Sequence, residues 1–207
     1  MPQFSIDEIF RGLNTKHRLT LFKPEDVQWI ETQIFEKNGK LYLKCLASDK
    51  DRTAKPEEIV RQLWIKKLLE EYHYTKSRIR VEYAVWFGSG VSDKSADFAI
   101  MQNDGEHPYI IFEVKKLKRK DGLQQLKSYC NAEGSPIGVW SNGEELVVLH
   151  REEHNVFLKS HLFQLLTKAF KTLSPSNGQL TSSQKKTVWS KSVYRLRKSS
   201  LTLNTLF

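Results

Sequence analysis

The chain has 207 residues, of which 39% are hydrophobic and 11% aromatic, enough to bury the core of one good-sized domain and to exclude overall disorder. Its two cysteines, Cys45 and Cys130, provide neither a disulfide framework nor a paired metal-ligand spacing, as expected of a reduced, cytoplasmic protein. The N-terminus lacks the basic-then-apolar pattern of a signal peptide, and no apolar run approaches the ~18 residues of a membrane span, so we expect no membrane contact.

The net charge of +9 is concentrated at the C-terminal end of the chain. All 24 acidic residues lie at or before Glu153, whereas nine of the 33 lysines and arginines follow it, so residues 1–153 hold 24 charges of each sign. The excess positive charge therefore falls in an acid-free segment. Such an asymmetry indicates contact with a polyanion, and a solubilising tail is the alternative that charge alone leaves open.

The N-terminal part of the chain predicts two short helices followed by a hairpin. We expect helices over residues 6–13 and 24–32, the second of which begins at a proline, a residue favoured in the first helical turn. Residues 33–46 alternate around Asn38-Gly39, a pair typical of a tight antiparallel turn. Residues 49–55 are polar and charged, and we interpret them as a connector.

The central part predicts a long helix and then three strands. The helix begins at Pro56 and ends near Tyr72, with apolar residues recurring at helical spacing. Strands are expected over residues 79–86, 96–101 and 109–115, with a glycine- and serine-containing loop at 88–95.

The remaining elements complete a mixed sheet flanked by helices. A second helix is expected over residues 123–132, followed by a hairpin whose turn is SNGEE, residues 141–145. Residues 157–173 predict one more amphipathic helix, and 174–183 are linker-like in composition. The order of elements favours an α/β fold with an N-terminal hairpin.

Two of the predicted strands carry charged residues inside apolar runs. Strand 109–115 reads YIIFEVK, and alternation places Glu113 and Lys115 on the same face as Ile111. Charges on a covered face are costly unless they serve each other or a ligand. Asp97 is the lone acid of the preceding strand, ADFAIM, and a hairpin-like connection would place it beside Glu113. Two carboxylates and an ammonium would then converge on one face of the sheet.

This combination is the one that metal-dependent phosphodiester hydrolysis requires. A divalent cation offsets the charge of the phosphate and lowers the pKa of the attacking water, and Mg2+ prefers oxygen ligands that include one or two carboxylates. A neighbouring base or cation positions the water. Each feature alone has a simpler explanation, because an isolated E-x-K is usually a solvated strand face and a lone Asp at a strand start usually caps a turn. The joint pattern favours a metal site.

Several stretches together resemble a known family. The stretches are KPEEIVRQLWIKKLLEEY, RIRVEYAVWFG, ADFAIMQNDG, IIFEVKKLK, GLQQLKSYC and GVWSNGEELVVL. Over about residues 33–150 they resemble the N-terminal nuclease domain of type I restriction-enzyme R subunits, a family of the PD-(D/E)xK superfamily. The resemblance implies a restriction-endonuclease-like mixed β-sheet flanked by helices. It divides the chain into an N-terminal helical element at 1–32, a nuclease-like domain at 33–155 and a basic C-terminal helix, linker and tail at 156–207.

The resemblance also implies roles for the charged residues. Asp97 and Glu113 would ligate Mg2+, with the Val114 carbonyl as a third oxygen ligand, and Mn2+ would substitute for Mg2+. Lys115 would position or activate the water and stabilise the pentacovalent phosphate.

Three further positions match motifs that the family places beside its site. Gln125 and Tyr129 match Q-x-x-x-Y, and their spacing of four puts them on one helix face. Glu57 or Glu58 matches the acidic residue that the first helix turns towards the metal, and we favour Glu57. Without the resemblance, the glutamine would be interpreted as a solvated amide and the tyrosine as a core aromatic. Ala96 stands where the superfamily has its often absent proline.

A basic run follows the catalytic strand. Most such runs are solvated faces, but its place at the strand exit favours contact with phosphates, giving affinity rather than sequence choice. The residues expected to bind nucleic acid are Lys116, Lys118, Arg119 and Lys120. By contrast, GSGVSDKS at 88–95 only approaches a phosphate-binding loop, because Asp93 replaces its second glycine and a strand follows it.

We therefore predict a Mg2+-dependent endonuclease that hydrolyses DNA in a restriction system. The alternatives left open are a nuclease fold retained as a DNA-binding or assembly module, and a docking partner alone. Expected partners are DNA, translocase or modification subunits, and a second copy of the chain, because cutting two strands with one site per chain is easiest in a pair. The sequence indicates no recognition site.

Overall fold

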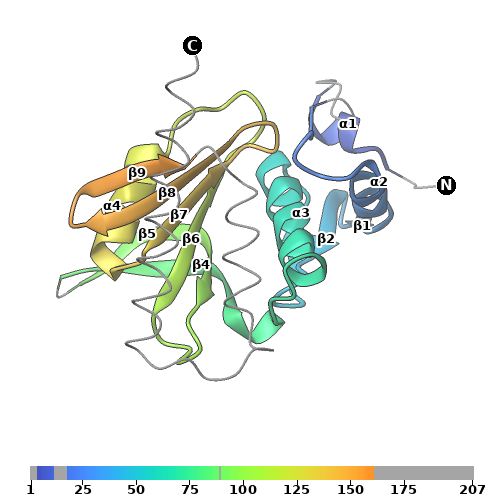
Figure 1. The fold of residues 1–207 in the computed structure, drawn as a ribbon. Coiled ribbons are helices and arrows are strands. Elements are labelled where there is room, and N and C mark those ends of the chain that lie inside the picture. Colours follow the sequence, from blue (N-terminus) through green and yellow to red (C-terminus); the bar gives the residue numbers. More distant parts are fainter. Residues whose placement is uncertain (1–3, 12–17, 89, 161–207) are drawn as a thin grey trace, which may run out of the picture. The chain divides into compact units, whose positions relative to one another are not determined.

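The structure is a computed structural model in which residues 4–11, 18–88 and 90–160 are described (Figure 1). Two helices, α1 (Ile6–Ile9) and α2 (Pro24–Thr32), are joined through a buried carboxylate. Glu31 accepts hydrogen bonds from the Ile6 N–H at 3.2 Å and the Ser5 hydroxyl at 3.4 Å. The second predicted helix is confirmed, whereas the first ends at Ile9 and not at residue 13.

A three-stranded antiparallel sheet follows, in the order β1 (Phe35–Lys37), β2 (Lys40–Lys44) and β3 (Asp51–Thr53). The predicted turn is confirmed, since Asn38 and Gly39 both have positive φ. Interpreting residues 49–55 purely as a connector is wrong, because β3 lies within them. The composition of this segment does not predict a strand, because β3 forms only by pairing with the edge of β2.

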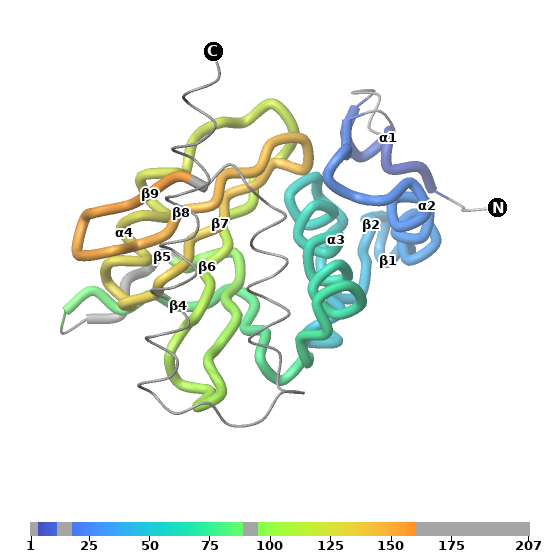
Figure 2. Tube along the Cα trace, in the orientation of Figure 1, coloured from blue at the N-terminus to red at the C-terminus, as the bar shows by residue number. Residues whose placement is uncertain are grey.

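Helix α3 (Pro56–Glu70) is covered on two sides (Figures 1 and 2). The Trp64 ring lies 5.4 Å from the Phe22 ring on one side and 5.8 Å from the Phe112 ring of the main sheet on the other. A helix enclosed in this way buries side chains on more than one face, and in α3 these include Glu58, Gln62 and Lys66. Its polar residues must therefore find partners within the protein.

The main sheet has six strands in sequence order, with all neighbours antiparallel except the parallel pair β6–β7. The strands are β4 (Ile79–Phe87), β5 (Gly90–Met101), β6 (Pro108–Val114), β7 (Ile137–Ser141), β8 (Leu146–Glu153) and β9 (Val156–Ser160). Helix α4 (Leu123–Glu133) connects β6 to β7. The predicted mixed sheet flanked by helices is confirmed.

The two faces of β6 belong to different halves of the core. Phe112 packs against Trp64 of α3, while Ile111 joins a buried cluster with Leu126 and Tyr129 of α4. Alternation along the strand gives this division, as predicted. It also places Glu113, one position beyond Phe112, on the α4 side of the sheet.

Two predictions at the strand ends are wrong. The expected loop at 88–95 is mostly strand, because β5 begins at Gly90 and continues the hairpin with β4. The helix expected from residue 157 is strand β9 as far as Ser160, where pairing with β8 overrides the amphipathic pattern. The remainder of that expected helix, the linker and the basic tail lie outside the described residues, as do residues 12–13. Within the described ranges, no helix is long and apolar enough to cross a membrane.

Candidate active site

Asp97 is fixed where three strands meet. Its neighbour Phe98 pairs with Phe112 of β6, and across from it on β4 Glu82 has a φ of 54°, a departure from strand geometry that is uncommon for a non-glycine residue. The Asp97 side chain turns to the end of β6, where Oδ2 accepts a hydrogen bond from the Val114 N–H at 2.7 Å. One carboxylate oxygen is thereby held in place by backbone.

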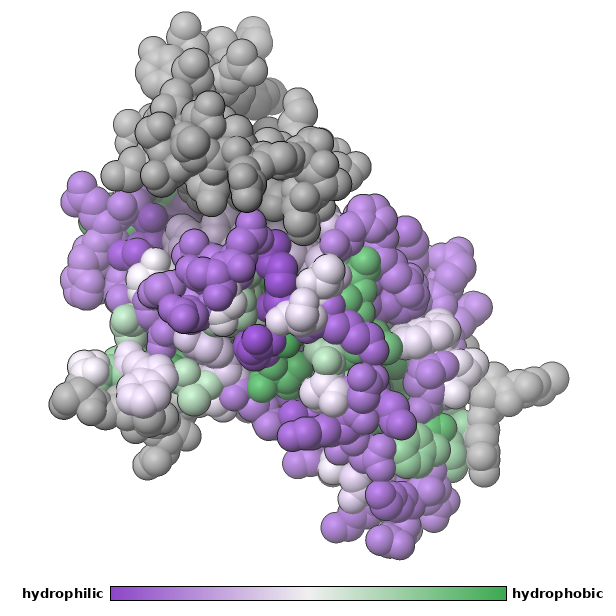
Figure 3. Space-filling model, turned by 90° about the horizontal axis from the view of Figure 1, so that it is seen from below, coloured by the Kyte–Doolittle hydropathy of each residue, from purple (hydrophilic) through white to green (hydrophobic). Residues whose placement is uncertain are grey.

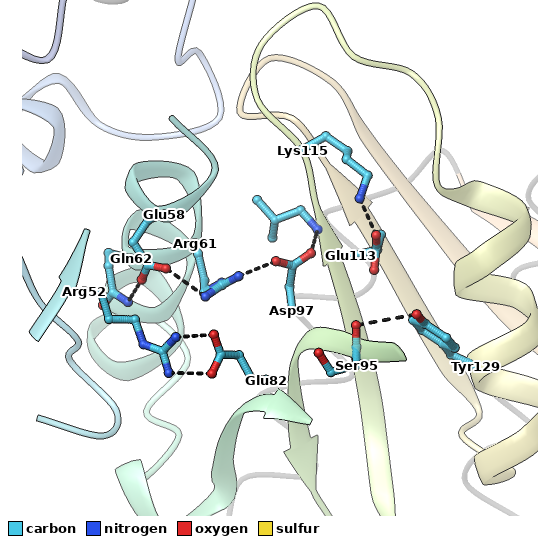
Figure 4. A network of polar contacts seen from close by, with 11 residues as sticks. Arg52, Glu58, Arg61, Gln62, Glu82, Ser95, Asp97, Glu113, Lys115 and Tyr129 are labelled. Carbon is cyan, nitrogen blue, oxygen red and sulfur yellow. Dashed lines mark hydrogen bonds and ion pairs between the residues drawn. The ribbon is translucent and has the colours of Figure 1, made fainter. Parts of the chain in front are cut away.

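Glu113 and Lys115 lie beside Asp97 at the C-terminal end of β6 (Figure 4). The Lys115 ammonium donates a hydrogen bond to Glu113 Oε1. The Glu113 side chain is 3% exposed, and within the described residues its buried Oε2 has no hydrogen-bond partner. An unsatisfied carboxylate oxygen is costly in an interior, so this atom is available to a ligand.

A second carboxylate reaches Asp97 through an arginine that the sequence reasoning missed. Arg61 of α3 donates to Asp97 Oδ1 at 2.5 Å and to Glu58 Oε2 at 2.7 Å, and Gln62 donates to Glu58 Oε1 at 2.7 Å. The guanidinium therefore bridges helix and sheet (Figure 4). The sequence feature that indicates this pairing is the spacing of Glu58 and Arg61, which carry opposite charges three residues apart on the helix with Ile59 and Val60 between them.

The two glutamates at the start of α3 lie in different surroundings. Glu58 is buried and connected to Asp97 through Arg61, whereas Glu57 is partly exposed and its charge acts on Arg119. The favoured residue, Glu57, is therefore near the basic loop, and the alternative, Glu58, is the one in the buried polar network.

Burial and charge shift the pKa of Glu113. Removal from water, together with the neighbouring Asp97 carboxylate, raises it to about 7, despite the opposing effect of Lys115. Burial lowers the pKa of Lys115, but the hydrogen bond and charge of Glu113 outweigh it, so the pKa of Lys115 is raised overall. Glu113 thus exchanges its proton close to neutral pH.

This shift predicts a pH dependence of stability. Because the pKa of the folded carboxyl, about 7, is above its ordinary value of 4.5, the metal-free protein should lose stability as the pH rises from about 5 to about 8. A cation bound to the carboxylate should have the opposite dependence, so the rise in melting temperature given by Mg2+ should increase over the same window. Melting curves in EDTA and in Mg2+ would measure both, and Glu113→Gln should flatten both. An Mg2+ effect equal at about pH 6 and pH 8 would contradict the assignment.

Gln125 and Tyr129 of α4 lie on the other side of Glu113. Gln125 donates a hydrogen bond to the Tyr129 hydroxyl, which lies 3.5 Å from the Ser95 carbonyl of β5. Burial is the largest cause of the raised pKa of Tyr129, and the charge of Glu113 adds to it. The Q-x-x-x-Y pair therefore lies within electrostatic reach of the carboxylates.

Gly122, at the start of α4, closes the space between this helix and the ion pair. Its φ is 99°, and a Cβ there would lie 2.9 Å from Lys115 Cε and 3.3 Å from Glu113 Cγ. The positive φ favours glycine, which adopts it freely, and a Cβ at this position would also displace the end of the Lys115 side chain.

The predicted basic residues lie on the loop between β6 and α4. Buried Leu117 and the bond from the Asn142 side chain to the Arg119 carbonyl, 3.1 Å, fix this loop. Lys116 and Lys118 are exposed, whereas the other two are exposed but paired, Arg119 with Asp121 at 2.6 Å and Lys120 with Glu145 at 3.0 Å. All four therefore reach solvent on the loop that follows the C-terminal end of β6.

A comparison with protein families assigns the domain. The family described as type I restriction enzyme R protein N terminus matches residues 56–161, just over half of the chain. The chain belongs to this family. The matched segment begins with α3 and includes the whole of the main sheet and α4. Membership indicates a role in a restriction system. Among curated proteins, none matches the chain.

Proposed function

We propose that the domain is a Mg2+-dependent endonuclease that cleaves DNA. The observation that supports this most directly is the convergence of Asp97, Glu113 and Lys115 at one strand end, with Glu113 Oε2 buried and unsatisfied within the described residues. A buried carboxylate oxygen without a partner, beside a second carboxylate, fits a hard divalent cation.

The donor set can be tested against the needs of the ion. In the part of the chain that the structure describes, no three or more His, Cys, Asp or Glu side chains are arranged so that together they could hold a metal ion. Mg2+ does not require such a group, because it keeps several waters and takes one or two carboxylates. Asp97, Glu113 and the Val114 carbonyl would therefore hold it. When bound, the ion would supply charge neutralisation and a more acidic water.

The protein's own side chains would perform the remaining steps. Lys115 would orient the attacking water and stabilise negative charge on the phosphate. Gln125 and Tyr129 would lie beside the site on α4, and Glu57 or Glu58 of α3 would be turned towards the metal. The exposed lysines of the loop between β6 and α4 would bind flanking phosphates without reading bases.

A second candidate function rests on a different observation. Asp97 and Glu113 already have cationic partners in Arg61 and Lys115, so each forms an ion pair without a metal ion. That arrangement favours a nuclease fold used as a DNA-binding or assembly module, for which other restriction subunits or a second copy of the chain would be partners.

Plasmid cleavage distinguishes the two functions. The wild-type chain should convert supercoiled plasmid to nicked and linear forms with Mg2+ or Mn2+ but not with EDTA, and Asp97→Asn should reduce the rate about 100-fold or more. Glu36→Gln, an exposed residue of β1, removes the same charge far from the site and should cut normally. Binding without cleavage under either metal would support the module instead.

A further inference from the structure

The hairpin of β4 and β5 exposes two large aromatic side chains. Trp86 is 54% exposed and Phe87 42% exposed, the highest values for aromatic residues among the exposed large hydrophobic residues of the described chain. The part of the surface seen in Figure 3 is mostly hydrophilic, with hydrophobic residues reaching it only in small areas. Adjacent exposed rings of this size are therefore more typical of a contact surface than of packing.

The structure holds these two residues in position. Glu133 of α4 accepts a hydrogen bond from the Trp86 N–H at 2.5 Å and another from the Tyr83 hydroxyl at 2.8 Å. The Phe87 ring packs on the Tyr129 ring, with centroids 6.2 Å apart. Trp86 is thus held through its backbone, while its side chain remains 54% exposed and accessible to a ligand.

Phe87 is the member of the pair that lies near the candidate active site. Alternation along β4 puts its side chain on the α4 side, with Tyr83 and Val85, and puts Trp86 on the opposite face of the same hairpin. The Tyr129 ring contacts Phe87, and its hydroxyl accepts a hydrogen bond from Gln125. The charges of Glu113 and Lys115 both act on the pKa of Tyr129. Its hydroxyl lies near the Ser95 carbonyl, two residues before Asp97 on the same strand. A nucleic-acid strand with a phosphate at the carboxylates would therefore pass close to Phe87 and to the end of the hairpin that exposes Trp86.

We propose that Trp86 and Phe87 stack on unpaired bases, so that the preferred substrate is DNA with a single-stranded or unwound segment. That the DNA passes this hairpin rests on the proposed function. That it is single-stranded there rests on the exposed rings. In a duplex the faces of the bases are stacked on one another and closed to side chains, whereas unpaired bases offer both faces to an aromatic ring. Stacking is also indifferent to sequence, as expected for a domain that binds chiefly through phosphates.

Binding in EDTA tests the proposal independently of cleavage. Fluorescence anisotropy would compare a labelled oligothymidylate with a duplex of equal length, using the whole chain. The wild type should bind the single strand more tightly, and Trp86→Ala should weaken that binding about tenfold while changing duplex binding little. Trp86→Phe should retain most of the affinity, because it keeps a stacking ring. Leu158→Ala, an exposed apolar residue of β9, is the matched control and should bind as the wild type does.

Each result has a definite meaning. Equal single-strand affinity of Trp86→Ala and the wild type, or preference of the wild type for duplex, would overturn the proposal even if the chain cleaves plasmid. Tryptophan-dependent single-strand binding by a chain that cuts nothing would support the proposal while the nuclease function fails. Loss of self-association in Trp86→Ala, with DNA binding unchanged, would make the pair a protein contact and overturn the proposal. Melting temperatures of all variants would establish that they fold.

Discussion

Lys115→Ala should reduce Mg2+-dependent nicking of plasmid DNA about 100-fold or more while leaving DNA affinity nearly unchanged. The Lys115 side chain is only 19% exposed, and its one charge is paired with Glu113. Its removal should therefore change the charge of the exposed surface that would bind DNA very little. What is lost is the cation beside the carboxylates, which in the proposed function would position the water and stabilise the charge that develops on the phosphate.

The matched control is Lys44→Ala, which removes an exposed lysine from β2 in the separate three-stranded sheet. It should nick plasmid at the wild-type rate. Because Lys115 also lowers the pKa of Glu113, the Lys115→Ala variant should be assayed over a range of Mg2+ concentrations and pH. A loss that persists at saturating metal and high pH belongs to Lys115 itself. Nicking equal to wild type under these conditions would exclude Lys115 from the reaction.

The sequence predicts which charged residues of the sheet come together. Alternation along an apolar strand places Glu113 on a covered face, and an antiparallel neighbour brings the lone acid of the preceding strand to the same end. Both arguments need only local pattern and one hairpin connection. The structure accordingly brings Asp97, Glu113 and Lys115 together.

The helix half could not be predicted in the same way. Adjacent glutamates in a first helical turn are satisfied there by the helix dipole and by water, so the local sequence gives no reason to prefer Glu58. Only the enclosure of α3 between the N-terminal elements and the sheet makes Glu58 and Arg61 buried charges that must pair. The predictions for the segments of β3 and β9 fail for the same reason, because each segment becomes a strand only by pairing with the edge of another strand. Burial on two sides and edge pairing are tertiary properties.

Arg61→Met should destabilise the metal-free protein by about 3–5 kcal/mol, and Mg2+ should restore much of that loss. The Arg61 side chain is 12% exposed and forms ion pairs with two carboxylates, Glu58 and Asp97, which are 9% and 13% exposed. Methionine keeps the packing of the stem but leaves both acids uncompensated beside Glu113, and an uncompensated buried charge is costly.

A divalent cation at Asp97 and Glu113 would replace the missing guanidinium charge, so the rise in melting temperature given by Mg2+ should be larger in Arg61→Met than in the wild type. Arg80→Met, which removes an exposed arginine of β4, should melt close to the wild type in EDTA and gain no more from Mg2+ than it does. If Mg2+ fails to recover Arg61→Met, the bridge between Arg61 and Asp97 is a structural ion pair, and no cation binds at Asp97. If Mg2+ stabilises Arg61→Met but not the wild type, Arg61 supplies in the metal-free protein some of the positive charge that the metal would otherwise supply. In that case helix α3 contributes to the site through Arg61, which keeps the Asp97 side chain in a position where it can bind the ion.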